Sequence, residues 1–123
     1  MITALDHVQV AMPAEGERDA RGFYSGLLGL NELEKPAALA ARGGAWFALP
    51  DGRQLHLGVE DPFRPSRKAH PAFVASLDEL AGRIQAGGLP VRRDDELAPR
   101  RRFYGEDSFG NRPFGNRLKL LEP

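Results

Sequence analysis

An internal repeat constrains this chain more than any other feature of its sequence. His70 lies 63 residues after His7, and Lys119 lies 63 residues after His56. The first pair stands near the start of apolar, strand-like runs. The second pair stands in segments that alternate polar and apolar residues after a turn signal. Since a repeat of this kind decides the fold, the sequence predicts one structural unit that occurs twice.

Hydrophobic spacing predicts the order β-α-β-β-β in each half. The expected elements of the first half are strands at 4–12, 30–34, 45–49 and 54–59, a helix at 17–28 and an irregular link at 37–42. Those of the second half are strands at 70–75, 89–93, 101–106 and 117–121, and a helix that follows a capping box of Ser76 and Glu79 and closes at Gly87-Gly88. The chain therefore divides into a first module at 1–60, a linker at 61–68 and a second module at 69–123, which together form one domain.

Alternation along the strands separates an apolar face from a polar one. In the first strand, Val8, Val10 and Met12 share the face that we expect to be buried, which leaves His7 and Gln9 on the other. By the same rule Gln54 and His56 share a face of the fourth strand, and Arg102 and Tyr104 share a face in the second half. A tandem duplication, Phe-Gly-Asn-Arg at 109–112 and 114–117, precedes the last strand, and we expect the turn to absorb it.

Composition excludes several classes of function. Lys plus Arg and Asp plus Glu both number 17, and this zero net charge argues against a nucleic-acid-binding protein. The absence of cysteine excludes disulfides, thiolate catalysis and cysteine zinc sites. The N-terminus lacks a signal-peptide pattern, and no apolar run reaches the roughly 20 residues that a membrane helix needs. We therefore expect a cytoplasmic protein without a membrane partner.

Short motifs in a fixed order carry a family resemblance over nearly the whole chain. They are Asp6-His7-Val8, Phe23-Tyr24, Leu27-Leu28-Gly29-Leu30, Gly43-Gly44-Ala45-Trp46-Phe47, Leu55-His56-Leu57, Ala69-His70-Pro71 and Phe114-Gly115-Asn116-Arg117-Leu118. With the doubled β-α-β-β-β order, they resemble the vicinal oxygen chelate superfamily, which includes glyoxalase I, the fosfomycin- and bleomycin-resistance proteins and the extradiol dioxygenases. The resemblance implies an α+β fold in which two tandem modules form an open, curved mixed sheet around a cavity.

The resemblance also implies a divalent metal site, with ligands from the first and fourth strands of each module. His7, His56 and His70 occupy three of these positions, and Lys119 stands where the family usually has glutamate. Imidazole suits Zn, Ni, Fe or Mn, and such a metal would act as a Lewis acid on two adjacent substrate oxygens. An ammonium group cannot coordinate a metal and repels it. Glu122 is three residues further on, so it points to the opposite face and does not replace the missing ligand.

Further polar and aromatic residues are expected to contact a small-molecule ligand in the cavity. They are Gln9, Trp46, Gln54, Arg102, Tyr104 and Lys119. Two functions stay open: a metal-dependent lyase, isomerase, thiol transferase or dioxygenase, and a non-catalytic protein that binds or sequesters a small molecule or drug. Lys119, in place of a metal ligand, favours the second of these functions. Since family members often pair, the resemblance also implies a homodimer.

Overall fold

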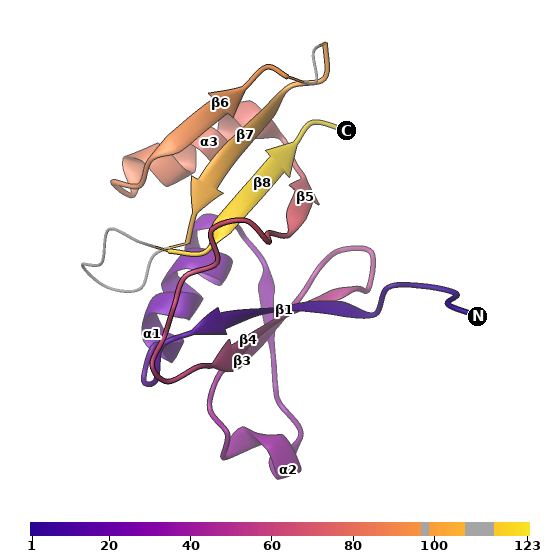
Figure 1. The fold of residues 1–123 in the computed structure, drawn as a ribbon, viewed down its shortest axis with the longest axis vertical. Helices are drawn as coiled ribbons and strands as arrows, with labels where there is room; N and C mark the ends of the chain where they lie inside the picture. The colour runs from indigo at the N-terminus through magenta and orange to yellow at the C-terminus, as the bar shows by residue number, and fades with distance from the viewer. Residues whose placement is uncertain (97–98, 108–114) are drawn as a thin grey trace. The chain divides into compact units, whose positions relative to one another are not determined.

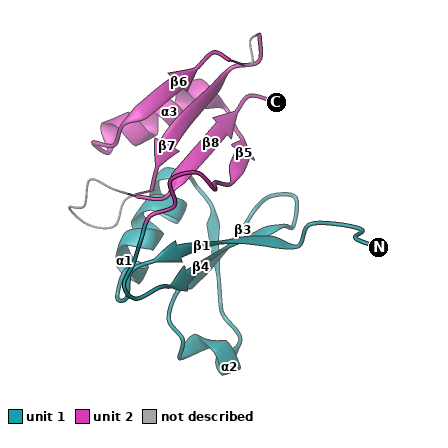
Figure 2. Cartoon of the chain, viewed as in Figure 1, with its two compact units in different colours: residues 1–64 teal, residues 65–123 magenta. Residues whose placement is uncertain are grey.

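The computed structural model describes residues 1–96, 99–107 and 115–123 and divides the chain into two compact units. Unit 1 is Met1–Arg64 and unit 2 is Pro65–Pro123 (Figure 2). Each unit has its own four-stranded mixed sheet and at least one helix (Figure 1). The predicted α+β class with tandem β-α-β-β-β modules is therefore confirmed.

Unit 1 builds its sheet in the order β1-β4-β3-β2. Its elements are β1 (His7–Met12), α1 (Glu17–Ala20), η1 (Arg21–Leu27), β2 (Asn31–Leu33), α2 (Ala37–Ala40), β3 (Ala45–Ala48) and β4 (Gln54–Val59). β1 and β4 run parallel, and the other neighbours are antiparallel. The buried face of this sheet carries Met12, Phe47, Leu55 and Leu57. Each such side chain contributes about 1.5–3 kcal/mol through burial.

The first helix differs from the regular helix that the sequence predicts at 17–28. It begins as the α-helix α1 and continues as the π-helical segment η1, in which the Leu28 N–H donates to the Phe23 carbonyl over five residues. This wider turn accompanies the burial of two consecutive aromatic residues, Phe23 and Tyr24. The Tyr24 ring lies 5.5 Å from that of Phe47, so the helix packs on the apolar face of the sheet.

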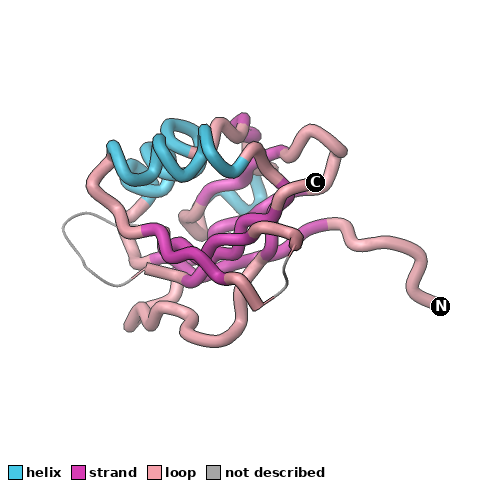
Figure 3. Tube along the Cα trace, turned by 90° about the horizontal axis from the view of Figure 1, so that it is seen from above, coloured by secondary structure: helices cyan, strands magenta, loops and turns pink. Residues whose placement is uncertain are grey.

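The segment that we expected to be an irregular link contains a short helix, α2. Pro36 precedes it in an extended conformation, and the helix itself is Ala-Ala-Leu-Ala. Alanine has the highest helix propensity, which explains a helical turn here without any buried residue. Helices are short throughout (Figure 3). Among the described residues, none combines the length and apolar character that crossing a membrane would require.

Unit 2 repeats the same topology in the order β5-β8-β7-β6. Its elements are β5 (Ala72–Val74), α3 (Leu77–Ala86), β6 (Val91–Asp94), β7 (Arg102–Glu106) and β8 (Arg117–Leu121). The repeat extends to the register of the parallel pairs, because Gln9 lies opposite His56 and Ala72 lies opposite Lys119. Both pairs are 47 residues apart in the sequence. Lys119 therefore holds the position in β8 that His56 holds in β4.

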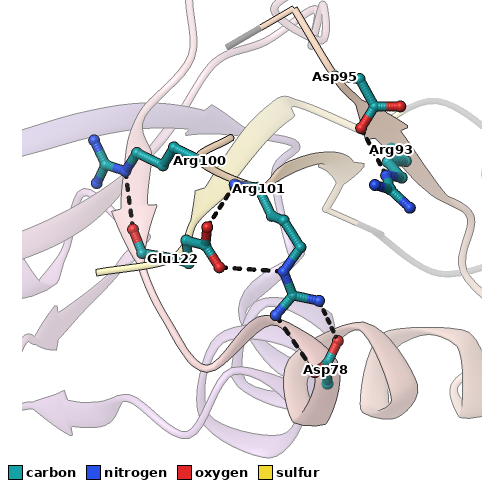
Figure 4. A network of polar contacts seen from close by, with 6 residues as sticks. All are labelled: Asp78, Arg93, Asp95, Arg100, Arg101 and Glu122. Atoms are coloured by element: carbon teal, nitrogen blue, oxygen red, sulfur yellow. Dashed lines mark hydrogen bonds and ion pairs between the residues drawn. The ribbon is translucent and has the colours of Figure 1, made fainter. Parts of the chain in front are cut away.

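Helix α3 covers one face of its own sheet and buries Leu77 and Ile84 (Figure 1). Ser76 occupies the N-cap position, but its side chain makes no capping hydrogen bond, so the predicted capping box does not form. Another contact fixes the start of the helix. The Arg101 guanidinium donates to the Asp78 carboxylate at 2.8 Å and to the Glu122 carboxylate at 3.1 Å (Figure 4). Arg101 thus joins α3 to the chain beyond β8.

Candidate functional site

The polar face of the unit 1 sheet collects most of the residues that the sequence singles out in the first half. His7 lies opposite Gln54, and Gln9 lies opposite His56 across the parallel pair β1–β4. Trp46 lies opposite His56 from β3. Side chains at opposite positions of neighbouring strands share a face. The register therefore gathers His7, Gln9, Trp46, Gln54 and His56 on one surface.

Three rings on this face form a continuous stack. The His56 imidazole lies 4.0 Å from the Trp46 ring at 2° and 4.1 Å from the His7 imidazole at 17°. The stack covers His56 so well that the residue is only 6% exposed, although it stands on the polar face. Stacking on Trp46 was not predicted from the sequence.

Hydrogen bonds fix the two imidazoles differently. His7 Nδ1 lies 2.8 Å from the Asp6 carboxylate, and His56 Nε2 lies 2.7 Å from the Gln54 side-chain carbonyl. Since that carbonyl can only accept, His56 donates through Nε2–H and carries its lone pair on Nδ1. Burial, and then the neighbouring His7, lowers the pKa of His56 below its ordinary value. His56 is therefore neutral at pH 7.

The stacked geometry does not suit a metal ion shared by His7 and His56. An imidazole nitrogen binds a metal in the plane of its ring, at about 2.0–2.1 Å. Two rings that lie 4.1 Å apart and nearly parallel have planes that meet only far outside this range. In residues 1–96, 99–107 and 115–123, no three His, Asp or Glu side chains converge as a metal site requires. A metal on this face would need at least one ring to rotate out of the stack.

The second half of the predicted site lies on the unit 2 sheet. Tyr104 in β7 stands opposite Lys119 in β8, and the Lys119 ammonium lies 5.1 Å from the centre of the tyrosine ring. His70 lies two residues before β5 rather than within it. Its ring meets Tyr104 edge-on at 5.8 Å, and its Nδ1–H donates to the Lys68 carbonyl at 2.8 Å. Unit 2 thus brings two of the predicted residues, His70 and Lys119, to the ring of a third, Tyr104.

Arg102, another predicted ligand contact, is committed to a carboxylate. Its guanidinium lies 2.8 Å from Asp94 and 3.7 Å from Glu96. The Arg102 and Asp94 side chains are only 13% and 10% exposed. The backbone N–H of Glu96, and then the charge of Arg102, hold the pKa of Asp94 below its usual range. The pair is neutralised within the sheet, so Arg102 offers little charge to a ligand.

Two cations that we did not single out also surround Tyr104. The Arg117 guanidinium lies 3.9 Å above the ring centre and that of Arg92 lies 5.7 Å away. Arg117 is the repeat counterpart of Gln54, since both stand two residues before the key side chain of the last strand in their unit. That equivalence could have identified Arg117. Arg92 depends on the β6–β7 register, in which it lies opposite Tyr104.

The duplicated segment before the last strand falls largely outside the described residues. The structure describes Gly115, Asn116 and Arg117 at its end. Asn116 is fully buried and donates to the Asp107 carboxylate at 3.0 Å, while its own side-chain carbonyl accepts the Ser66 N–H at 3.0 Å. These bonds hold the start of unit 2 against the end of the β7–β8 connection.

Known proteins of the same fold were found by structural comparison. The chain matches no family model and no curated protein sequence. A glyoxalase family protein from Bacillus anthracis is 41% identical, with 99% of this chain and 96% of that chain covered and a TM-score of 0.88. A glyoxalase/dioxygenase from Nostoc punctiforme is 25% identical over 98% and 91% of the two chains, with a TM-score of 0.75. The fosfomycin resistance protein FosX from Listeria monocytogenes shares the fold, at 18% identity, 100% and 95% coverage and a TM-score of 0.75.

Proposed function

Because the chain belongs to the glyoxalase family of the vicinal oxygen chelate superfamily, we propose that it binds a small oxygenated molecule at its polar sheet faces without requiring a divalent metal. One observation carries this proposal. Lys119 stands in β8 where His56 stands in β4, and its ammonium lies over Tyr104. A fixed cation at the position of a metal ligand disfavours a metal and favours an anionic or strongly polar ligand.

The stacking of His7 on His56 supports the same function. Rings that are nearly parallel at 4.1 Å do not direct two lone pairs towards one point, as a shared metal would require. Trp46 covers the other face of His56, so a ligand would meet the edges of the stack or the outer faces of His7 and Trp46. A small planar or oxygen-rich molecule can meet such a surface by stacking and by hydrogen bonds to Gln9 and Gln54.

A metal-dependent lyase, isomerase, thiol transferase or dioxygenase is the second candidate. The specific observation in its favour is the Asp6–His7 contact at 2.8 Å. A carboxylate on one nitrogen of an imidazole orients the ring, as it does behind many metal ligands. The neutral state of His56 is also the state that a metal requires. Zn, Ni, Fe or Mn would be the ions to consider.

Calorimetric titration with Zn²⁺, Ni²⁺ and Mn²⁺ distinguishes the two candidates. We expect weak or absent binding by the wild-type protein, purified without a histidine tag, and at least a tenfold gain in Lys119→Glu. A tenfold gain corresponds to about 1.4 kcal/mol, which a new carboxylate ligand and the loss of repulsion can supply. Lys68→Glu makes the same charge change at an exposed position and controls for general electrostatics.

Tight stoichiometric binding of a metal by the wild-type protein would contradict the metal-free function and support the enzyme. An equal gain in Lys119→Glu and Lys68→Glu would show that the effect is one of net charge. In that case Lys119 would not occupy a ligand position.

A further inference from the structure

We propose that unit 2 carries an oxyanion site, formed by Arg92, Arg117 and Lys119 around Tyr104, that takes the dianionic phosphate group of a small ligand. The inference deepens the proposed function, on which it rests, by naming the ligand class. Arg92, Tyr104 and Lys119 lie directly opposite one another on three neighbouring strands, β6, β7 and β8. Arg117 is two residues before Lys119 and so shares its face.

The three cations are close to one another but have no carboxylate to neutralise them. Their charged groups lie 3.9 to 5.7 Å from the centre of one tyrosine ring. Among the described residues, no Asp or Glu lies within ion-pair distance of any of the three. The ring stabilises each cation by roughly 0.5–1 kcal/mol at an exposed site. An anion between them would remove their mutual repulsion.

Neighbouring arginines show how unusual this lack of partners is. Arg93, Arg101 and Arg102 all pair with carboxylates, at 2.7, 2.8 and 2.8 Å respectively. Arg92 is adjacent to Arg93 in the same strand yet has no such partner. The Nε of Arg117 is buried without a hydrogen-bond partner, and one of its terminal nitrogens makes only a 3.4 Å contact with the Arg67 carbonyl. Among the described residues, Arg92, Arg117 and Lys119 thus lie around Tyr104 without a carboxylate partner.

Arg92, Arg117 and the Tyr104 ring line a pocket of about 650 Å³ that belongs wholly to unit 2, and Lys119 adjoins this group through the same ring. Its other walls include Ser66, Pro90 and Glu106. Hydrogen bonds hold the Ser66 wall in place, since its N–H donates to the Asn116 side chain at 3.0 Å and its carbonyl accepts the Arg117 N–H at 3.1 Å. The pocket is thus built from ordered backbone rather than from free side chains alone.

The chemistry of the group favours a dianion. Guanidinium groups bind phosphate with paired N–H donors, and an ammonium adds a compact point charge. The charged residues that line the pocket are three arginines, Arg67, Arg92 and Arg117, and one carboxylate, Glu106. They leave an excess of two positive charges, which a phosphate monoester matches better than a carboxylate. The Tyr104 ring gives the organic part of the ligand an apolar surface.

Titration calorimetry at low ionic strength tests the site, with inorganic phosphate, phenyl phosphate and acetate as probes and EDTA present throughout. We expect both phosphates to bind with one-to-one stoichiometry and acetate to bind at least about tenfold more weakly. Arg92→Gln and Lys119→Met should each weaken phosphate binding roughly tenfold, because each removes one cation from the site. Arg93→Gln, which removes the adjacent arginine that Asp95 already neutralises, should stay within about twofold of wild type. Circular dichroism confirms that each variant is folded.

Absence of phosphate binding at millimolar concentration in low salt would overturn the site. Equal losses in Arg92→Gln and Arg93→Gln would also overturn it, because they would show non-specific attraction. Equal affinities for phosphate and acetate would overturn the assignment to a dianion. Each of these results would leave the metal titrations of the proposed function unaffected, so the two failures are distinguishable.

Discussion

Gly44 holds a backbone conformation that other residues rarely adopt, just before the strand that carries Trp46. Its φ is +87°, and a Cβ added there would lie 2.1 Å from the Leu57 carbonyl oxygen. We predict that Gly44→Ala lowers the free energy of unfolding by at least about 2 kcal/mol, through both strain and this clash. Urea denaturation followed by circular dichroism measures the change.

Gly22 provides the matched control for that substitution. It lies within η1 at a negative φ, and a Cβ added there would meet nothing within 4 Å. Gly22→Ala should be neutral or should stabilise the protein by roughly 0.5–1 kcal/mol, because alanine reduces the entropy of the unfolded chain. Equal destabilisation by both substitutions would contradict the role assigned to Gly44.

The repeat in the sequence predicts that His56 and Lys119 hold equivalent positions, but it does not predict which residues lie beside them. His56 and Lys119 do hold equivalent register positions, as the shared spacing predicts. The stack of Trp46 on His56 and the position of Arg92 beside Tyr104 depend on which residues face each other across hairpins. Arg102 was predicted to meet a ligand, and only the register shows that Asp94 already neutralises it. Periodicity gives the face of a side chain, whereas its partners require the pairing of strands.

The Arg101 contacts tie helix α3 to the end of β8 and make unit 2 sensitive to acid. Hydrogen bonds from Arg101 lower the pKa of both Asp78 and Glu122 below their usual values. A carboxylate with a lowered pKa in the folded state stabilises the fold above its unfolded pKa of about 4 and loses this contribution as pH falls further. We predict that the free energy of unfolding falls less steeply below pH about 4 in Arg101→Gln than in wild type. Chemical denaturation across that pH range measures both slopes.

Arg93→Gln controls for the loss of one arginine, since Arg93 pairs with Asp95 outside the Arg101 contacts (Figure 4). It should leave the acid slope closer to wild type than Arg101→Gln does. Identical slopes in wild type and Arg101→Gln would show that these carboxylates do not depend on Arg101.

The last strand of each unit and helix α3 were predicted better than the first helix and the ends of the other strands. β4 and β8 have the bounds that alternation predicts, with Leu55 and Leu57 in the first and Leu118 and Leu120 in the second buried on one face. β5 begins only at Ala72, which leaves His70 outside the strand. The π-helical η1 accommodates adjacent buried aromatics, and α2 reflects intrinsic alanine propensity. Tertiary packing and local propensity decide such details, and a periodic pattern does not contain them.

At the scale of the whole molecule, we predict that the protein forms a homodimer. The edge strand β5 leaves Val74 61% exposed, and an exposed apolar residue on a sheet edge is a site for association. Light scattering should give about twice the 13.5 kDa mass of one chain. Val74→Lys should shift the equilibrium towards the monomer. A wild-type monomer at tens of micromolar would contradict the prediction.

The stack of Trp46 on His56 also makes Trp46 an intrinsic fluorescence probe of this site. Trp46 is the only tryptophan in the sequence, and its indole lies parallel to an imidazole at 4.0 Å. A protonated imidazole in contact with indole quenches its fluorescence, so emission from this protein follows the charge and the occupancy of one stack in unit 1. Unit 2 has no tryptophan, so it contributes no emission when indole is excited selectively. Fluorescence therefore follows events at His7 and His56, whereas calorimetry follows all binding. The difference between the two signals belongs to the other half of the chain.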